Sequence, residues 1–148
     1  MPAVTLNFDI LDDLVRSTRK LDGAVVKAGV QGDADSELLT YAAANEFGTD
    51  DGHVPERSYI RSTATAKQDD WSELAARAMA DAIADPHGDP RRALELLGAV
   101  MQGDIQQAIV DIRTPPNAPE TIRRKKSDNP LIDTGRLRSA ITWVVETE

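Results

Sequence analysis

The sequence contains no cysteine, which excludes disulfide bonds, thiolate metal sites and cysteine nucleophiles. Aromatic side chains are few, with two each of Trp, Tyr and Phe, so a core must be built mainly from Ala, Leu, Val and Ile. No apolar run approaches the ~20 residues that span a bilayer, and no basic segment followed by an apolar stretch stands at the start. We therefore expect a soluble protein that is made inside the cell and does not contact a membrane.

Positive charge is scarce as well. The 148 residues carry 17 Lys and Arg against 25 Asp and Glu, a net charge of -8. Residues 1–112 hold 10 basic and 20 acidic residues, whereas residues 113–148 hold 7 basic and 5 acidic ones. Coating a nucleic acid needs a positive protein face, so the acidic residues 1–112 argue against a general nucleic-acid-binding protein. The basic last quarter of the chain still allows a local contact with a negatively charged partner. The length predicts a single domain over residues 1–148.

Hydrophobic periodicity predicts an α+β fold in the order β-α-β-α-α-α-β. We expect a small, mainly antiparallel sheet packed against two long helices, with a long extended loop before the last strand. Phe47 is placed on the apolar face of the helix before the long pair. The predicted elements are strand 4–8, helix 10–21, strand 24–30, helix 36–47, a long helix through 71–83, a long helix 90–112 and strand 141–145.

Capping residues and glycines refine these boundaries. Asp35 or Ser36 is predicted to cap the helix before the long pair, and Asp89 is predicted to cap the second long helix. Gly98 and Gly103 lie inside that second helix, where each costs it about 1 kcal/mol relative to alanine. A packing contact or a bend is therefore expected at these glycines.

Two segments without a hydrophobic period are the candidate interaction segments. The first is the loop 49–61, and the second is the arm 114–130, which contains four prolines and the basic run Arg123–Lys126. Long connections inside a compact domain are usually functional or mobile. Pro119 can start a single helical turn in the arm, but little more. The basic run allows three interpretations, which are a solvated surface, a protein contact and a contact with DNA phosphates.

Catalytic chemistry finds little support in the sequence. Asp50, Asp51 and His53 offer metal-ligand types, but no second pair with metal-site spacing accompanies them. A Gly-rich phosphate loop and a serine nucleophile elbow are both absent. We therefore expect no enzyme, no cofactor and no bound metal. A small metal-dependent hydrolase that uses these three residues remains the alternative.

Three segments carry a resemblance to a known family. They are Tyr41–Thr49, which ends in Glu-Phe-Gly-Thr, then 54–61 with its Pro-Glu-Arg motif, and 130–141, which contains Pro-Leu-Ile-Asp-Thr-Gly. In this order they resemble the phage head–tail joining and tail-completion (neck) proteins, including the virion-morphogenesis proteins of Mu-like phages. Ser58 and Tyr59 stand where the family usually has Pro-Phe.

The resemblance implies a structural virion protein of a tailed bacteriophage. Such a protein forms an oligomeric ring, a hexamer, at the head–tail interface and is needed to join head to tail. Its partners are the connector or adaptor and the tail terminator or tail tube, and DNA passing through the lumen is a possible contact. It is assembled in the host bacterial cytoplasm and resides in the neck or tail of the virion. A DNA-contacting adaptor is the other alternative.

The expected interface residues are basic or aromatic, because forked Arg donors and aromatic anchors dominate protein contacts. Asp133 is expected to accept hydrogen bonds from the amides of Gly135 and Arg136, which would fix the entry to the last strand. The residues predicted to contact neighbouring subunits or partners are Arg57, Tyr59, Arg61, Arg123, Arg124, Lys125, Lys126 and Arg136.

Overall fold

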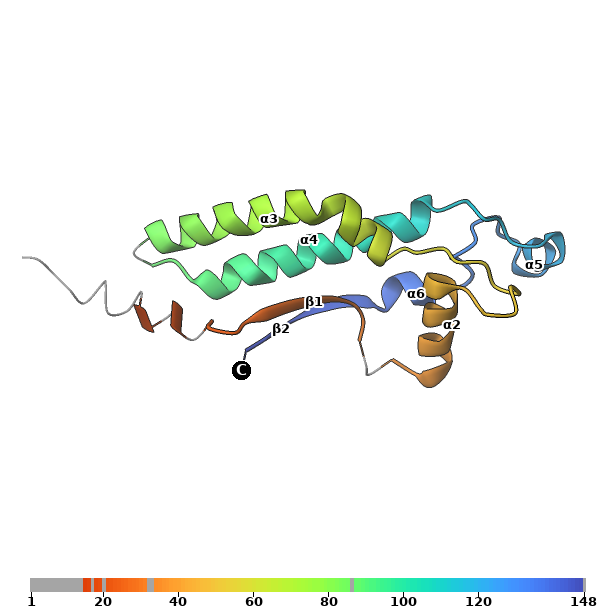
Figure 1. Cartoon of the computed structure of the whole chain (residues 1–148), viewed down its shortest axis with the longest axis horizontal. Coiled ribbons are helices and arrows are strands. Elements are labelled where there is room, and N and C mark those ends of the chain that lie inside the picture. Colours follow the sequence, from red (N-terminus) through yellow and green to blue (C-terminus); the bar gives the residue numbers. More distant parts are fainter. Residues whose placement is uncertain (1–14, 17, 20, 32–33, 86, 148) are drawn as a thin grey trace, which may run out of the picture.

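The computed structural model describes residues 15–16, 18–19, 21–31, 34–85 and 87–147. Over these residues the chain combines a two-stranded antiparallel sheet with helices, which confirms the predicted α+β class (Figure 1). None of the helices described is long and apolar enough to cross a membrane. The elements are β1 Val25–Val30, α2 Ser36–Phe47, α3 Arg61–Ala84, α4 Pro90–Asp111, α5 Pro119–Lys125, α6 Arg136–Ser139 and β2 Ile141–Glu146.

Two predicted elements fall mostly on residues that are not described. The predicted strand 4–8 lies outside the described residues, as does most of the predicted helix 10–21. Val15, Arg16 and Thr18 belong to that predicted helix and are helical. The other predicted strands and the predicted cap residues lie within the described part, where they are tested.

The sheet joins the two ends of the described chain. β1 pairs antiparallel with β2 in a register that places Val25 opposite Glu146 and Val30 opposite Ile141. The short β-branched run 24–30 predicts β1, and the alternation of Ile141, Trp143 and Val145 predicts β2. Because Val30 pairs with Ile141, the end of β1 that leads into α2 lies beside the start of β2 that follows α6.

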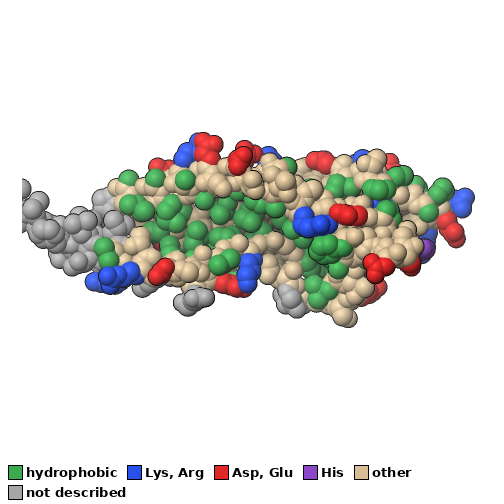
Figure 2. Space-filling view, in the orientation of Figure 1, with side chains coloured by type: hydrophobic (Ala, Val, Ile, Leu, Met, Phe, Trp, Pro, Cys, Tyr) green, Lys and Arg blue, Asp and Glu red, His purple; other side chains and the backbone are tan. Residues whose placement is uncertain are grey.

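The two long helices and the sheet form three successive layers, with α4 in the middle (Figure 1). Trp71 on α3 donates its indole N–H to the Asp104 carboxylate on α4 at 2.7 Å and fixes the two helices together. Asp89 accepts from the Arg91 amide, and Pro90 takes the first helical position, as the sequence predicted. Figure 2 shows hydrophobic side chains in a band between α3 and the sheet, along this middle layer.

At Gly98, α4 packs against the Trp143 ring of β2 and leaves no room for a side chain. An added Cβ at Gly98 would lie 2.6 Å from atoms of the Trp143 ring on β2, whereas Gly103 has open space around it. The predicted packing contact is therefore confirmed at Gly98. Gly103 has no such contact, and its cost to the helix is not offset by packing.

These two glycines give a matched test of the packing. Gly98→Ala is expected to lower the free energy of unfolding by about 1–3 kcal/mol, because the methyl group overpacks the Trp143 contact. Gly103→Ala is expected to raise it by up to about 1 kcal/mol, because alanine favours the helix. Urea unfolding of both variants measures the two effects. Stabilisation by both substitutions would contradict the close contact.

Buried side chains concentrate where α4, α6 and β2 meet the segments around residues 59 and 131. This cluster joins the long-helix layer to the end that carries α2 and α5 (Figure 1). It positions the segments that carry the family resemblance against a common core. Its fully buried members are Tyr59, Ile105, Ile109, Leu131, Leu137 and Ile141.

The arm 114–130 differs from its prediction. It contains α5, which runs over seven residues from Pro119 to Lys125 rather than a single turn. Its composition explains the extra length, because Glu120 lies in the first turn and basic residues fill the last, where each sign complements the helix dipole. The helix ends at Lys126 in the left-handed conformation. The basic run is therefore displayed on a helix.

The predicted cap by Asp133 is wrong. α6 begins after Gly135, whose φ of 82° is left-handed, and no side chain bonds to this helix start. The left-handed glycine turns the chain sharply enough that the Asp133 side chain is not used as a cap. Asp35, by contrast, caps α2 by accepting from the Leu38 amide at 2.8 Å, as predicted.

Candidate functional site

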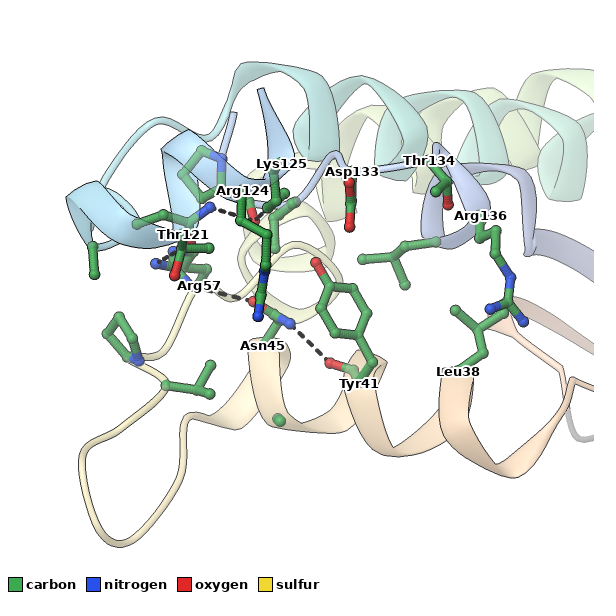
Figure 3. Close-up of a pocket in the computed structure, with 18 of the residues that line it drawn as sticks. Leu38, Tyr41, Asn45, Arg57, Thr121, Arg124, Lys125, Asp133, Thr134 and Arg136 are labelled. Carbon is green, nitrogen blue, oxygen red and sulfur yellow. Dashed lines mark hydrogen bonds between the residues drawn. The ribbon is translucent and has the colours of Figure 1, made fainter. Parts of the chain in front are cut away.

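The three segments that carry the resemblance meet in space at one end of the molecule. One side of α2, the loop before α3 and the segment before α6 surround a cleft of about 460 Å³, and α5 forms another wall (Figure 3). Segments more than 80 residues apart in sequence therefore form one site.

Glu46 is the central polar group of this end, although it was not among the predicted site residues. Its carboxylate is almost completely buried and accepts the amide N–H groups of Tyr59, Ile60 and Arg61 at 2.8 to 3.0 Å. These amides form the start of α3, and Ile60 at the N-cap position supplies no side-chain bond. Glu46 from α2 thus caps α3, because the first amides of a helix lack internal partners.

The hydrogen bonds keep Glu46 ionised. Burial alone would raise its pKa, but the amides of Ile60, Arg61 and Tyr59 and the Ser58 hydroxyl together hold the pKa below its ordinary value. The Ser58 hydroxyl donates to Oε1 at 2.8 Å. A buried carboxylate with this many donors fixes the direction in which the loop enters α3.

Arg57 joins three segments of the chain. Its guanidinium donates to the carbonyls of Pro115 and Pro116 at 2.6 and 3.1 Å and to the side-chain oxygens of Asn45 and Asn117, both at 3.2 Å. Only 4% of the residue is exposed. The forked geometry of arginine allows one side chain to hold α2, the loop and the arm together. All four acceptors are neutral, so the positive charge of Arg57 adds to the field in the cleft.

The expectation that Arg57 and Tyr59 contact a partner needs correction. Tyr59 has no exposed surface, and its hydroxyl donates to the Ala42 carbonyl at 3.3 Å. Burial raises its pKa, with the Glu46 charge acting in the same direction. The hydrogen bonds from the loop to Glu46, together with those made by Arg57, hold this part of the loop against α2. Tyr59 is therefore not part of the surface that a partner would meet, and Arg57 reaches such a surface only where it lines the cleft.

Arg61 and Phe47 form an exposed pair beside the cleft. The Arg61 guanidinium lies 4.7 Å from the centroid of the Phe47 ring and pairs with Glu46 and Glu56. Phe47 is 62% exposed, so its predicted place on a buried helix face is wrong. It is the last residue of α2, where the chain turns away at Gly48. An exposed aromatic ring with a stacked arginine is typical of contact sites.

Lys125 is the partly buried member of the basic run. Its ammonium group donates to the carbonyls of Asn129 and Pro130 at 3.3 and 3.2 Å, which ties α5 to the segment before α6. Its pKa is lowered mainly by burial; the charge of Asp133 acts to raise the pKa, and the charges of Arg57 and Arg124 act to lower it. Lys125 therefore lies among both positive and negative charges.

The cleft gathers half of the predicted interface residues. Arg57, Arg124, Lys125 and Arg136 line it, whereas Arg61, Arg123 and Lys126 lie outside its lining. Arg136 forms an exposed ion pair with Asp35 at the start of α2. Within the basic run, Arg124 and Lys125 therefore face the cleft, whereas Arg123 and Lys126 do not line it.

Tyr41 supplies a polar group within the cleft. It projects from α2 toward Asp133, between Arg124 on one side and Leu38 on the other (Figure 3). Its pKa is raised by burial and next by the charge of Asp133. The hydroxyl is therefore a neutral hydrogen-bond donor at physiological pH.

The loop that suggested a metal site has another organisation. Asp51 accepts the Thr49 hydroxyl at 2.6 Å and the His53 amide at 3.0 Å, so its carboxylate holds the turn. No group of three or more metal-ligating side chains occurs in the described ranges. The hydrolase alternative with Asp50, Asp51 and His53 therefore gains no support from the geometry of this loop.

Comparisons with protein-family models, with curated proteins and with solved structures each find no match to this chain.

Proposed function

We propose that this chain is a non-enzymatic structural protein of a tailed bacteriophage virion. It forms an oligomeric ring, expected to be a hexamer, at the head–tail interface and serves in joining head to tail. The connector or adaptor on one side and the tail terminator or tail tube on the other are the partners that this role requires. The observation that carries the proposal is the convergence of the three resembling segments on one cleft. Glu46 and Arg57 bind the first two segments together, and Asn117 and Lys125 hold the third through the Pro130 carbonyl.

The shape and charge of this end support assembly with like subunits. A ring needs two different surfaces that match head to tail. The basic helix α5 provides one such surface, and the acidic loop with the exposed residues Asp50, Asp51 and Glu56 provides another. The exposed Phe47 and Arg61 add an aromatic and a forked cation, the side-chain types that dominate contact energies.

Virions made without this chain test the proposed role directly. In a phage whose genome encodes the chain, loss of its gene is expected to leave filled heads and finished tails that fail to join. Electron microscopy counts the joined particles, and antibody labelling of normal virions is expected to mark the head–tail joint. Normal joining without the chain, or its absence from finished virions, would contradict the proposal.

Reversal of the exposed charge on α5 tests the contribution of the arm. Replacing Arg123, Arg124 and Lys126 with glutamate is expected to reduce self-association at least about tenfold, because close charge pairs steer and stabilise such contacts. Lys125 is kept, since it holds the arm to its own subunit. Sedimentation measures association, and circular dichroism checks that the subunit remains folded.

The matched control reverses three exposed arginines on the long helices, and it is expected to leave association within about threefold of the original chain. The control residues are Arg77, Arg91 and Arg92. An equal loss in both triple variants would show an effect of net charge alone. Salt-dependent binding of duplex DNA that disappears with the α5 variant would favour the adaptor alternative.

A further inference from the structure

The residues that line the cleft carry more positive than negative charge, with Arg57, Arg124, Lys125 and Arg136 against Glu37 and Asp133. Arg57 and Lys125 donate all their hydrogen bonds within the described part of the chain to neutral oxygen acceptors. Arg124 is exposed in the last turn of α5, and no hydrogen bond or ion pair to it occurs within the described part of the chain. Asp133 is the carboxylate whose charge acts on Lys125. An anion in the cleft would relieve the repulsion among these cations.

The remaining lining limits the kind of anion. Leu38, Val54 and Leu131 give the cleft apolar walls, and Glu37 and Asp133 are acidic residues of its lining. The cleft therefore suits one or two carboxylates carried on a short peptide segment. A duplex presents a phosphate charge about every 1.7 Å and requires an extended positive surface, which this bounded cleft does not provide.

The same chain displays a rigid acidic segment of the required size. The turn Thr49–Val54 is closed by bonds from the Gly52 amide to the Thr49 carbonyl at 2.8 Å and from the Thr49 amide to the Val54 carbonyl at 2.9 Å. Asp51 holds the turn internally, and the Asp50 side chain is exposed. Because the turn is already ordered, its insertion into a partner would cost little conformational entropy.

We propose that the cleft receives this acidic turn from a second copy of the chain, with Asp50 pairing with Arg124. This inference rests on the proposed self-assembly and specifies the contact that produces it. Asp50 lies outside the lining of its own cleft, although His53 and Val54 of the same turn belong to that lining. In a head-to-tail ring, the turn of each subunit would enter the cleft of the next subunit. The Tyr41 hydroxyl lies in the same cleft and projects toward Asp133 (Figure 3).

Exchange of the paired charges tests the proposal. Arg124→Glu and Asp50→Arg are each expected to weaken self-association at least about tenfold, measured by sedimentation of the full-length protein. The double variant Asp50→Arg, Arg124→Glu is expected to regain most of the lost association. Recovery in the double variant identifies the pair, because two independent losses would add.

Arg123→Glu is the matched control, because it makes the same charge change one residue away and outside the cleft lining. It is expected to weaken association by less than about threefold. Equal effects at Arg123 and Arg124, or a double variant weaker than both single variants, would overturn the proposed pair. Binding of duplex DNA by the original chain that Arg124→Glu abolishes would also overturn it, since nucleic acid would then be the occupant.

The two proposals fail in distinguishable ways. If the original chain associates and Arg124→Glu leaves association unchanged, the contact proposed here is wrong and the ring is formed by another surface. If the original chain remains a single subunit at the highest concentration reached, both the proposed ring and the proposed contact between Asp50 and Arg124 are wrong. The role at the head–tail joint then rests on the virion experiment alone.

Discussion

Replacing Glu46 with alanine is expected to lower the free energy of unfolding by about 3–5 kcal/mol, because a buried carboxylate that serves many donors is removed. The substitution leaves the amides of Tyr59, Ile60 and Arg61 without their acceptor at the start of α3. It also creates a cavity between α2 and the loop. Urea unfolding followed by circular dichroism measures the loss.

Glu56→Ala is the matched control, because Glu56 also pairs with Arg61 but is exposed. Surface pairs contribute about 1 kcal/mol or less, so this variant is expected to remain close to the original chain. Equal losses for the two variants would contradict the capping role of Glu46. A loss confined to Glu46→Ala would show that the buried carboxylate, rather than charge on this surface, fixes the start of α3.

The same contact predicts the response to acid. The pKa of Glu46 in the folded protein lies below its ordinary value of 4.5. Its stabilisation is therefore complete above the unfolded-state pKa and is lost as the pH falls through the lower folded-state value. The original chain is expected to lose stability more steeply below pH 4.5 than Glu46→Gln does. Parallel acid dependence in the two proteins would show that Glu46 does not titrate as inferred.

Replacing Arg57 with lysine is expected to cost about 2–4 kcal/mol of unfolding free energy, although the charge is retained. An ammonium group cannot reach the carbonyls of Pro115 and Pro116 together with the Asn45 and Asn117 side chains, so the buried Asn45 and several partly buried acceptors compete for too few donors. Amide hydrogen exchange in α5 is expected to accelerate, because Arg57 holds the chain just before this helix.

Arg136→Lys provides the control for Arg57→Lys. Arg136 also lines the cleft, but its pair with Asp35 is exposed, and its replacement is expected to cost about 1 kcal/mol or less. Unfolding of both variants under the same conditions isolates the effect of the buried fork. If Arg57→Lys were as mild as Arg136→Lys, the account of a guanidinium that fixes the arm would be wrong.

Local patterns were sufficient for most of the fold. The strands at Val25–Val30 and Ile141–Glu146, the capped starts at Asp35 and Asp89, and the close contact at Gly98 all follow from periodicity or chemistry within a few residues. The arm was predicted less well. Its prolines suggested extended chain, but Pro119 starts a seven-residue helix that ends with favourable charge.

The site was harder to predict, because its contacts join distant segments. Arg57 and Tyr59 have the composition of an exposed contact, yet bonds across 12 to 60 residues of sequence bury Arg57, and Tyr59 has no exposed surface. Phe47 shows the reverse error, since a helix-end position left a large aromatic ring in solvent. A charged Glu46 amid apolar helix positions was the available signal, because such a residue needs buried donors.

The structure separates two roles within the segments that carry the resemblance. Buried Glu46 and Arg57 hold the subunit together, whereas Phe47, Arg61 and the α5 cations remain at its surface. We expect substitutions of the first group to alter stability and substitutions of the second to alter association. Variants of the surface residues are expected to remain folded, so a loss of assembly in them can be assigned to a lost contact between subunits.

The native mass of the purified chain tests the central claim of self-assembly most directly. The account predicts one closed complex, near six times the 16.1 kDa of the subunit, whose size does not change as the concentration rises. Native mass spectrometry at several concentrations provides this measurement. A species of 16.1 kDa throughout, or chains that lengthen without limit, would contradict a closed ring built from this protein.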